Sequence, residues 1–165
     1  MCGICGELRG PDEGRRERLA AMAEHLAHRG PDDAGFVLDA GIGLGHRRLS
    51  VIDPAGGHQP LATADGTVQV VANGELYNFC DLRQMLEAQG ARFRTRSDSE
   101  VLVHLYASLP GRSAVASCRA LLEQLNGMFA FALWDATARR LVLARDRLGQ
   151  KPLFYGRTAA GALLF

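Results

Sequence analysis

The second residue of the chain, Cys2, has the position with the most specific chemical consequence. Removal of Met1, which a small second residue permits, would leave a thiol and a free α-amine on the same residue. An α-amine titrates near pH ~8 and a thiol near ~8.5, so the amine can take the thiol proton directly or through a water. The sequence therefore predicts a nucleophile that supplies its own base and needs no catalytic histidine.

Other interpretations of Cys2 remain open from the residues alone. Cys2 is otherwise a buried structural cysteine or, with Cys5 in the pattern Cys-Gly-Ile-Cys, part of a redox pair or a zinc site. Residues 3–8 read as a strand, on which residues three apart point to opposite faces. The strand disfavours a bridge or a shared metal, and Cys80 and Cys118 occur singly, without a second Cys-x-x-C.

Asn73 and Gly74 offer the two donors that attack on a carbonyl requires. One side-chain amide and one backbone N–H would stabilise an oxyanion, and such donors are worth roughly 100-fold to 1000-fold each. Asn-Gly is equally the sequence of a tight hairpin turn. The residues that follow, beginning with Glu75, run into a helix instead of a returning strand. The two interpretations are evenly balanced on the residues.

Asp98 and Arg48 carry the charges that could fix a substrate. Asp98 could hold an ammonium group, or simply lie in the first turn of a helix that Ser97 and Glu100 cap as a capping box. Arg48 could pair with a carboxylate through its planar guanidinium, although a surface salt bridge is the ordinary role of any single arginine. Arg48, Glu75 and Asp98 together would recognise the head group of an α-amino acid.

The elements that must position these residues follow from hydrophobic periodicity. We predict strands over residues 3–8, 34–39, 43–52, 67–72, 128–134 and 140–145, two short strands over 153–156 and 161–165, and helices over about 19–26, 81–89, from 97 onward, and 114–124. Residues 128–134 have no polar alternation, so both faces of that strand should be buried. Short connections imply antiparallel pairing. An α+β fold, a four-layer αββα sandwich of two antiparallel sheets, satisfies both observations; one sheet with helices on one side is the alternative.

Composition places the chain among ordinary globular domains. Its 165 residues are 47% hydrophobic and 22% charged, with a formal net charge of +1 and a single lysine, Lys151. This charge gives no reason to expect nucleic acid or a membrane as a partner. The charged segment after the first strand argues against a signal peptide, and four cysteines without a disulfide framework favour a cytoplasmic location. The oligomeric state is open.

The chain resembles the glutaminase domain of the class II glutamine amidotransferases, which are N-terminal nucleophile hydrolases. The resemblance is greatest to the glutamine-dependent asparagine synthetases. It rests on motifs that run in the family's order along nearly the whole chain, at residues 1–4, 28–32, 45–53, 59–61, 73–78, 97–100, 126–132 and 145–153. Some of these motifs are weak individually, but the series is highly specific.

This resemblance implies a role for each candidate residue. It implies Cys2 as the nucleophile, Asn73 and the Gly74 N–H as the oxyanion hole, and a four-layer sandwich as the fold. It also implies that Arg48, Glu75 and Asp98 bind the glutamine head group and that Val51 contributes backbone contacts. The loop at residues 29–32 is similar to one near the nucleophile, and His28 and His46 are left as structural residues.

The predicted function is hydrolysis of glutamine to glutamate and ammonia, with no metal or organic cofactor in that step. In the family, a second domain that uses ATP and Mg receives the ammonia, and residues 1–165 contain neither an S-G-G-x-D-type loop nor a P-loop. The ammonia-using synthetase would therefore act in cis, if this is a fragment, or in trans. The alternative functions are a catalytically silent domain that docks on a synthetase and a thiol redox protein.

Overall fold

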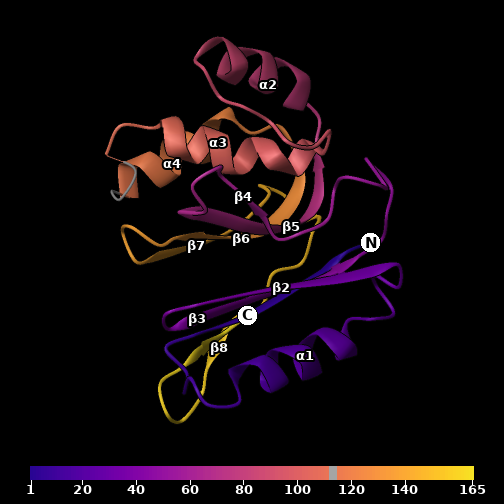
Figure 1. The fold of residues 1–165 in the computed structure, drawn as a ribbon, viewed down its shortest axis with the longest axis vertical. Helices are drawn as coiled ribbons and strands as arrows, with labels where there is room; N and C mark the ends of the chain where they lie inside the picture. Colours follow the sequence, from indigo (N-terminus) through magenta and orange to yellow (C-terminus); the bar gives the residue numbers. More distant parts are fainter. Residues whose placement is uncertain (112–114) are drawn as a thin grey trace.

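Two antiparallel sheets pack face to face between helices in the structure, a computed structural model that describes residues 1–111 and 115–165 (Figure 1). One sheet has the strand order β2-β3-β1-β9-β8 and contains β1 (Gly3–Leu8), β2 (Asp33–Asp39), β3 (Ile42–Arg48), β8 (Gly156–Arg157) and β9 (Leu163–Leu164). The other has the order β4-β5-β6-β7 and contains β4 (Leu61–Ala62), β5 (Val68–Leu76), β6 (Gly127–Asp135) and β7 (Arg140–Arg145). The predicted four-layer sandwich is confirmed.

Strand β6 shows why the sandwich has four layers. Phe129, Phe131 and Leu133 belong to the hydrophobic cluster that includes the helices, whereas Ala132 and Trp134 pack in the cluster between the sheets. Alternate residues of a strand point to opposite faces, so an apolar strand needs a cover on each side. The prediction that both faces of this segment are buried is therefore confirmed, and the single-sheet alternative is wrong.

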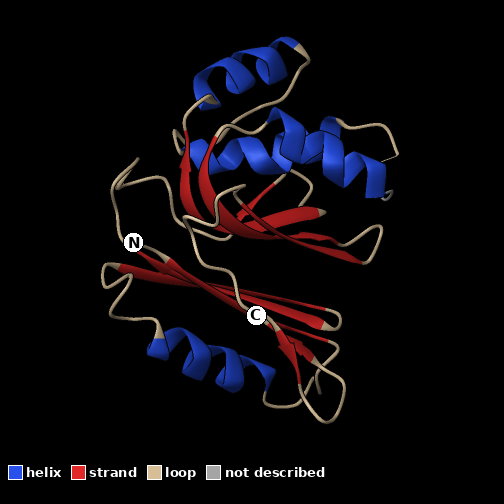
Figure 2. Cartoon of the chain, turned by 180° about the vertical axis from the view of Figure 1, so that it is seen from behind, coloured by secondary structure: helices blue, strands red, loops and turns tan. Residues whose placement is uncertain are grey.

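The helices are divided unequally between the two sheets. Helix α1 (Arg15–His25) lies against the first sheet, and the second sheet carries α2 (Phe79–Ala88), η1 (Asp98–Glu100), α3 (Val101–Ser108) and α4 (Val115–Gln124) on its outer side (Figure 2). The predicted start of the last helix, Ala114, lies outside the described residues. None of these helices is long and apolar enough to cross a membrane within residues 1–111 and 115–165.

The predicted capping box at Ser97 forms only in part. The Ser97 hydroxyl accepts a hydrogen bond from the Ser99 N–H at 3.3 Å, as an N-cap should. The Glu100 carboxylate does not return to Ser97, because it accepts the N–H groups of Arg94 and Thr95, each at 2.8 Å. The Ser97 N–H donates to the Thr95 hydroxyl instead. Glu100 thus fastens the preceding loop onto this helix.

Several predicted strand boundaries differ from the structure. The strand expected over residues 67–72 is Val68–Leu76, so Glu75 lies in the strand and the following helix begins only at Phe79. The strand expected over residues 43–52 ends at Arg48, after which the chain turns so that backbone carbonyls of residues 52–54 face the Arg48 guanidinium. Near the C-terminus, strand β8 begins at Gly156, so residues 153–155 are not a strand. The early end of β3 matters for function because it leaves the backbone of Leu49 free to contact Cys2.

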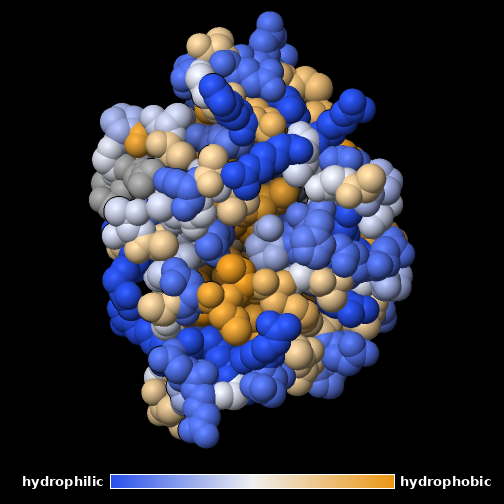
Figure 3. Space-filling view, in the orientation of Figure 1, coloured by the Kyte–Doolittle hydropathy of each residue, from blue (hydrophilic) through white to orange (hydrophobic). Residues whose placement is uncertain are grey.

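The edge strands β7 and β8 leave an open side of the sandwich. A groove of about 1060 Å³ runs between them, with Leu141, Leu143 and Leu163 among its lining residues. Figure 3 shows apolar side chains gathered in a hollow in the middle of the face seen in Figure 1. The groove contains none of the predicted site residues, which meet in a different cavity.

Candidate active site

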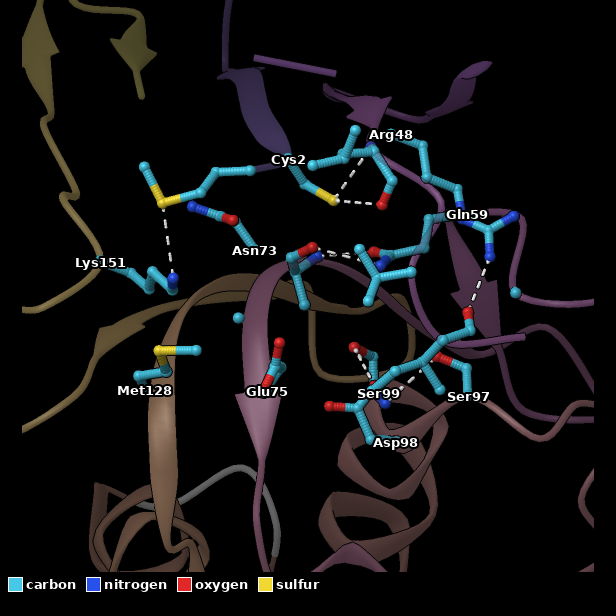
Figure 4. A pocket seen from close by; sticks show the side chains of 17 residues that line it. Cys2, Arg48, Gln59, Asn73, Glu75, Ser97, Asp98, Ser99, Met128 and Lys151 are labelled. Carbon is cyan, nitrogen blue, oxygen red and sulfur yellow. Dashed lines mark hydrogen bonds between the residues drawn. The ribbon is translucent and has the colours of Figure 1, made fainter. Parts of the chain in front are cut away.

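A cavity of about 270 Å³ between the two sheets brings the predicted site residues together. All seven line it: Cys2, Arg48, Val51, Asn73, Gly74, Glu75 and Asp98. They come from the residue just before β1, the end of β3, the loop after β3, strand β5 and helix η1, which are far apart in the sequence (Figure 4). The volume is at the lower end for small-molecule sites, so it suits a ligand of amino-acid size.

The Cys2 thiol lies against the backbone where β3 has just ended. The Leu49 N–H donates to Cys2 Sγ at 3.4 Å, and Sγ lies 3.7 Å from the Leu49 carbonyl oxygen. Arg29 Nε donates to the Cys2 carbonyl oxygen at 3.2 Å, which places the predicted loop 29–32 beside the nucleophile. The thiol is therefore fixed at the cavity wall and remains half-buried.

Cys5 lies on the opposite face of β1 from the sheet interface. It packs with Leu19 and Ala23 of α1, and burial raises the pKa of its thiol to about 12. All four cysteines are free. A thiol held protonated in an apolar layer is a poor partner for disulfide exchange, so the structure gives the Cys-x-x-C pattern a packing role at its second cysteine.

Asn73 and Gly74 lie inside the β5–β6 ladder, where they pair with Ala130 and Phe129, so the hairpin interpretation of Asn-Gly is wrong. A Cβ at Gly74 would come within 2.1 Å of the Met128 carbonyl oxygen, which explains the glycine at this position. The Asn73 side-chain amide makes no hydrogen bond within the described part of the chain and lines the cavity. It is thus available to donate to a ligand.

The residue before Asn73 is fixed by two side chains that the sequence did not single out for this purpose. The Gln59 side-chain amide bonds both backbone groups of Ala72, as a paired strand would. Its Nε2 donates to the Ala72 carbonyl oxygen at 3.1 Å, and its Oε1 accepts the Ala72 N–H at 2.7 Å. His46 Nε2 also lies 3.1 Å from that carbonyl oxygen. Burial lowers the pKa of His46 to about 4, so the neutral ring donates here as a structural residue.

The Asp98 carboxylate is deeply buried at the far end of the cavity from Cys2 (Figure 4). It accepts the Leu76 N–H at 2.8 Å, which ties helix η1 to the end of β5. Burial raises the pKa of Asp98 above its ordinary value, and the nearby Glu75 carboxylate adds to that effect, while the backbone N–H groups oppose it. Two interacting carboxylates that line one cavity form a suitable site for an ammonium group.

Arg48 is less free than the sequence suggests. Its Nη1 donates to the Pro54 carbonyl oxygen at 3.0 Å, and its Nη2 donates to those of Ile52 and Asp53 at 3.0 and 2.6 Å. The guanidinium therefore shapes the loop that carries Val51, and only its remaining surface faces the cavity. Val51 lines the cavity and is 66% exposed, which places it at the rim.

The cavity also contains residues that sequence reasoning missed. Lys151, Met128 and Gln59 line it, and Lys151 is buried although it is a lysine. The signals in the sequence were that all three residues lie in the matching motifs at residues 59–61, 126–132 and 145–153, and that Lys151 is the single lysine of the chain. No group of three His, Cys, Asp or Glu side chains suited to a metal ion occurs within residues 1–111 and 115–165.

Comparison with known proteins gives a consistent result. The profile of a family described as "Glutamine amidotransferase domain" matches residues 1–165. Asparagine synthetase [glutamine-hydrolyzing] 1 of Bacillus subtilis is 40% identical over 159 residues, which are 94% of this chain and 24% of that protein. Asparagine synthetase [glutamine-hydrolyzing] 2 of Arabidopsis thaliana is 39% identical over 167 residues, which are 100% of this chain and 27% of that protein.

Solved structures agree on the fold. The allosteric regulatory enzyme of purine biosynthesis superposes with a TM-score of 0.81 at 25% identity, covering 99% of this chain and 41% of that one. The glutamine phosphoribosylpyrophosphate amidotransferase of B. subtilis superposes with a TM-score of 0.77 at 24% identity. The chain thus spans about a quarter of the length of the curated relatives it matches.

Proposed function

The chain belongs to the glutamine amidotransferase domain family, and on that premise we propose that Cys2 hydrolyses glutamine to glutamate and ammonia through a γ-glutamyl thioester. One observation supports this most strongly: a thiol, a free amide donor and two carboxylates that could hold an ammonium line one small cavity. The fold is that of the N-terminal nucleophile hydrolases, and the predicted membership of the glutamine amidotransferases is confirmed.

The chemistry begins when the α-amine of Cys2, freed by removal of Met1, takes the thiol proton. The sulfur then attacks the side-chain carbonyl carbon of glutamine. Asn73 and the Gly74 N–H donate to the oxygen as it becomes negative. The amine returns its proton to the departing nitrogen, which leaves as ammonia. A water, deprotonated by the same amine, then attacks the thioester carbonyl, so that glutamate leaves and the thiol is restored.

The head group of glutamine would lie at the other end of the cavity. Its ammonium pairs with Asp98 and Glu75, and its carboxylate meets the free surface of Arg48 and the backbone at Val51. This orientation directs the side-chain amide toward Cys2 and Asn73, because the two sets of residues line opposite ends of the cavity (Figure 4). Binding by remote charged groups positions the reacting carbon, which is a large part of enzymatic rate enhancement.

The ammonia released by this domain would be used by a synthetase region outside it. The curated relatives are named asparagine synthetases, and this chain matches about a quarter of each. We therefore place the ATP- and Mg-dependent amidation in a synthetase region, joined to this domain or supplied by a partner protein. Asparagine formation is the reaction that the relatives' names support.

The test is release of glutamate and ammonia from glutamine by the purified protein, compared with a Cys2→Ala variant. Loss of the nucleophile should lower kcat by at least about 10⁴-fold while leaving the melting temperature nearly unchanged. A wild-type protein that binds glutamine without hydrolysing it, with Cys2 still linked to Met1, would instead support a silent docking domain. Equal activity in the variant would overturn the assignment of Cys2.

A further inference from the structure

Lys151 reaches the active-site cavity from the loop that follows β7. It is the single lysine of the chain, its side chain is buried, and it lines the same cavity as Cys2 and Asn73. Figure 4 shows it on the Asn73 side of the cavity, across from Arg48 and Asp98. Lys151 therefore lies at the end where bonds would change and away from the end where the head group would bind.

The position of Lys151 is fixed by a dedicated carboxylate. Asp146 Oδ2 accepts the N–H groups of Lys151 at 3.0 Å and Phe129 at 3.2 Å, and Oδ1 accepts those of Gln150 at 2.9 Å and Leu148 at 3.1 Å. Burial alone would raise the pKa of Asp146, but these N–H groups outweigh it and lower the pKa. Because Phe129 pairs with Gly74, Asp146 links the lysine loop to the strand pair that carries the oxyanion donors.

The Lys151 ammonium has no acidic partner in the described part of the chain. Its Nζ donates to Met1 Sδ at 3.5 Å, and a thioether sulfur is a weak acceptor. A buried ammonium is ordinarily paired with a carboxylate because its desolvation is costly. The proposed activation of the enzyme also removes Met1, and with it this contact. An unneutralised positive charge would then remain beside the reacting groups.

The other charged groups around Cys2 have different tasks. Arg29 holds the Cys2 carbonyl oxygen and Arg48 holds the loop at residues 52–54. The other ionisable groups lie farther along: Glu75 and Asp98 line the far side of the cavity, and Cys5, His25 and His28 line the adjoining pocket behind Cys2. Unlike these two arginines, the Lys151 ammonium donates to no backbone oxygen and no carboxylate among residues 1–111 and 115–165.

We propose that Lys151 activates Cys2 electrostatically, by favouring the thiolate and the uncharged α-amine over the thiol and the ammonium. A fixed positive charge stabilises a nearby anion and disfavours a second cation, so both effects act in the direction that the reaction needs. The inference rests on the proposed function for its catalytic meaning. Lys151 acts through Cys2, and Asp146 is the residue that positions it.

The experiment compares Lys151→Met and Lys151→Gln, which remove the charge, with Lys151→Arg, which keeps it. The readouts are the pH profile of kcat/KM for glutamine and the rate at which iodoacetamide alkylates Cys2, followed by peptide mass spectrometry. Without the charge, the acid limb of the profile should move up by about one pH unit, and alkylation at pH 7 should slow by about tenfold. Lys151→Arg should stay close to the wild type.

Exposed Cys80, which lies in helix α2 away from the cavity, gives an internal control because its alkylation rate should be the same in every variant. Circular dichroism identifies any variant that fails to fold, and the second neutral variant then carries the test. A folded neutral variant with the wild-type pH profile and Cys2 alkylation rate would overturn the inference. A charge-dependent alkylation rate in a protein that does not hydrolyse glutamine would contradict the proposed function alone.

Discussion

The two ends of the cavity differ in how their polar groups are engaged. At the head-group end, Arg48 donates to three carbonyl oxygens and Asp98 accepts the Leu76 N–H, so the protein itself fixes both side chains. At the reactive end, the Asn73 amide has no partner in the described part of the chain, and Lys151 has only a sulfur. The Arg48 and Asp98 side chains are thus held before the ligand arrives, whereas the Asn73 amide and the Lys151 ammonium are kept free for atoms that change charge.

The comparison is tested most severely at Asn73. An Asn73→Ala change removes one oxyanion donor but keeps the Gly74 N–H, so kcat should fall about 100-fold to 1000-fold with little change in KM. Steady-state kinetics on glutamine measures both values. Asn78→Ala is the matched control, because Asn78 bonds Gln124 and Asn126 outside the cavity and should affect stability alone. A kcat for Asn73→Ala within threefold of the wild type would remove Asn73 from the reaction.

Asp98→Asn should affect binding in preference to chemistry. Loss of the charge that pairs with the substrate ammonium should raise KM about 10-fold to 100-fold and change kcat much less. In the wild type, KM should rise as the pH falls through the raised pKa of Asp98, because the protonated acid cannot attract the ammonium. Isothermal titration with glutamine checks the binding loss, and Asp81→Asn on the surface of helix α2 is the control.

Asp98→Asn should weaken glutamine binding but should not lower the stability of the fold. The pKa of Asp98 is raised in the folded state. The free energy of unfolding therefore falls as the pH rises from the pKa of the unfolded chain through that of the folded protein, and the ionised carboxylate still destabilises the fold at neutral pH. Asn removes that cost and can still accept the Leu76 N–H. Asp98→Asn should therefore melt at or above the wild-type temperature at pH 7. A lower melting temperature would show that Asp98 serves mainly to hold the fold together.

Arg48→Lys should give a smaller effect that combines binding and stability. A lysine keeps the charge but cannot reproduce the fork that reaches Ile52, Asp53 and Pro54, so the loop should loosen. We expect KM to rise about tenfold and the free energy of unfolding to fall by about 2 kcal/mol. The neighbouring Arg47 points the other way and donates to Gly30, so Arg47→Lys should leave KM unchanged. Equal effects of the two changes would contradict the assignment of Arg48.

Cys5→Ala should give the smallest effect. Cys5 is buried against helix α1, so truncation should lower the free energy of unfolding by about 1 kcal/mol through lost packing and leave glutamine hydrolysis unaltered. Urea denaturation and the glutaminase assay measure the two quantities. Loss of activity with an intact fold would restore the interpretation in which Cys2 and Cys5 act as a redox pair.

Local patterns predicted much of this structure. The strand at residues 3–8 and the strand at residues 140–145 have the predicted bounds, because their apolar runs are bordered by turn residues. The apolar run in β6 predicted the four layers, because burial on both faces can be read from composition alone. The series of motifs also predicted seven of the residues that line the cavity, though not Gln59, Met128 or Lys151.

Long-range contacts account for what the sequence did not predict. The end of β3 at Arg48 depends on carbonyl groups of a loop that folds back upon the guanidinium. The incomplete capping box depends on Arg94 and Thr95, whose N–H groups compete for Glu100. The place of Lys151 depends on a bond between Asp146 and another strand. None of these contacts follows from periodicity or from spacing along the chain.

The central claim is that Cys2 reacts with its own α-amine free. Intact-protein mass spectrometry before and after labelling with an electrophilic glutamine analogue, such as a diazoketone, tests this most directly. Every molecule that takes the label on Cys2 should have lost Met1, glutaminase activity should fall in proportion to labelling, and molecules that retain Met1 should stay unlabelled. Full glutaminase activity in protein that still carries Met1 would contradict the account.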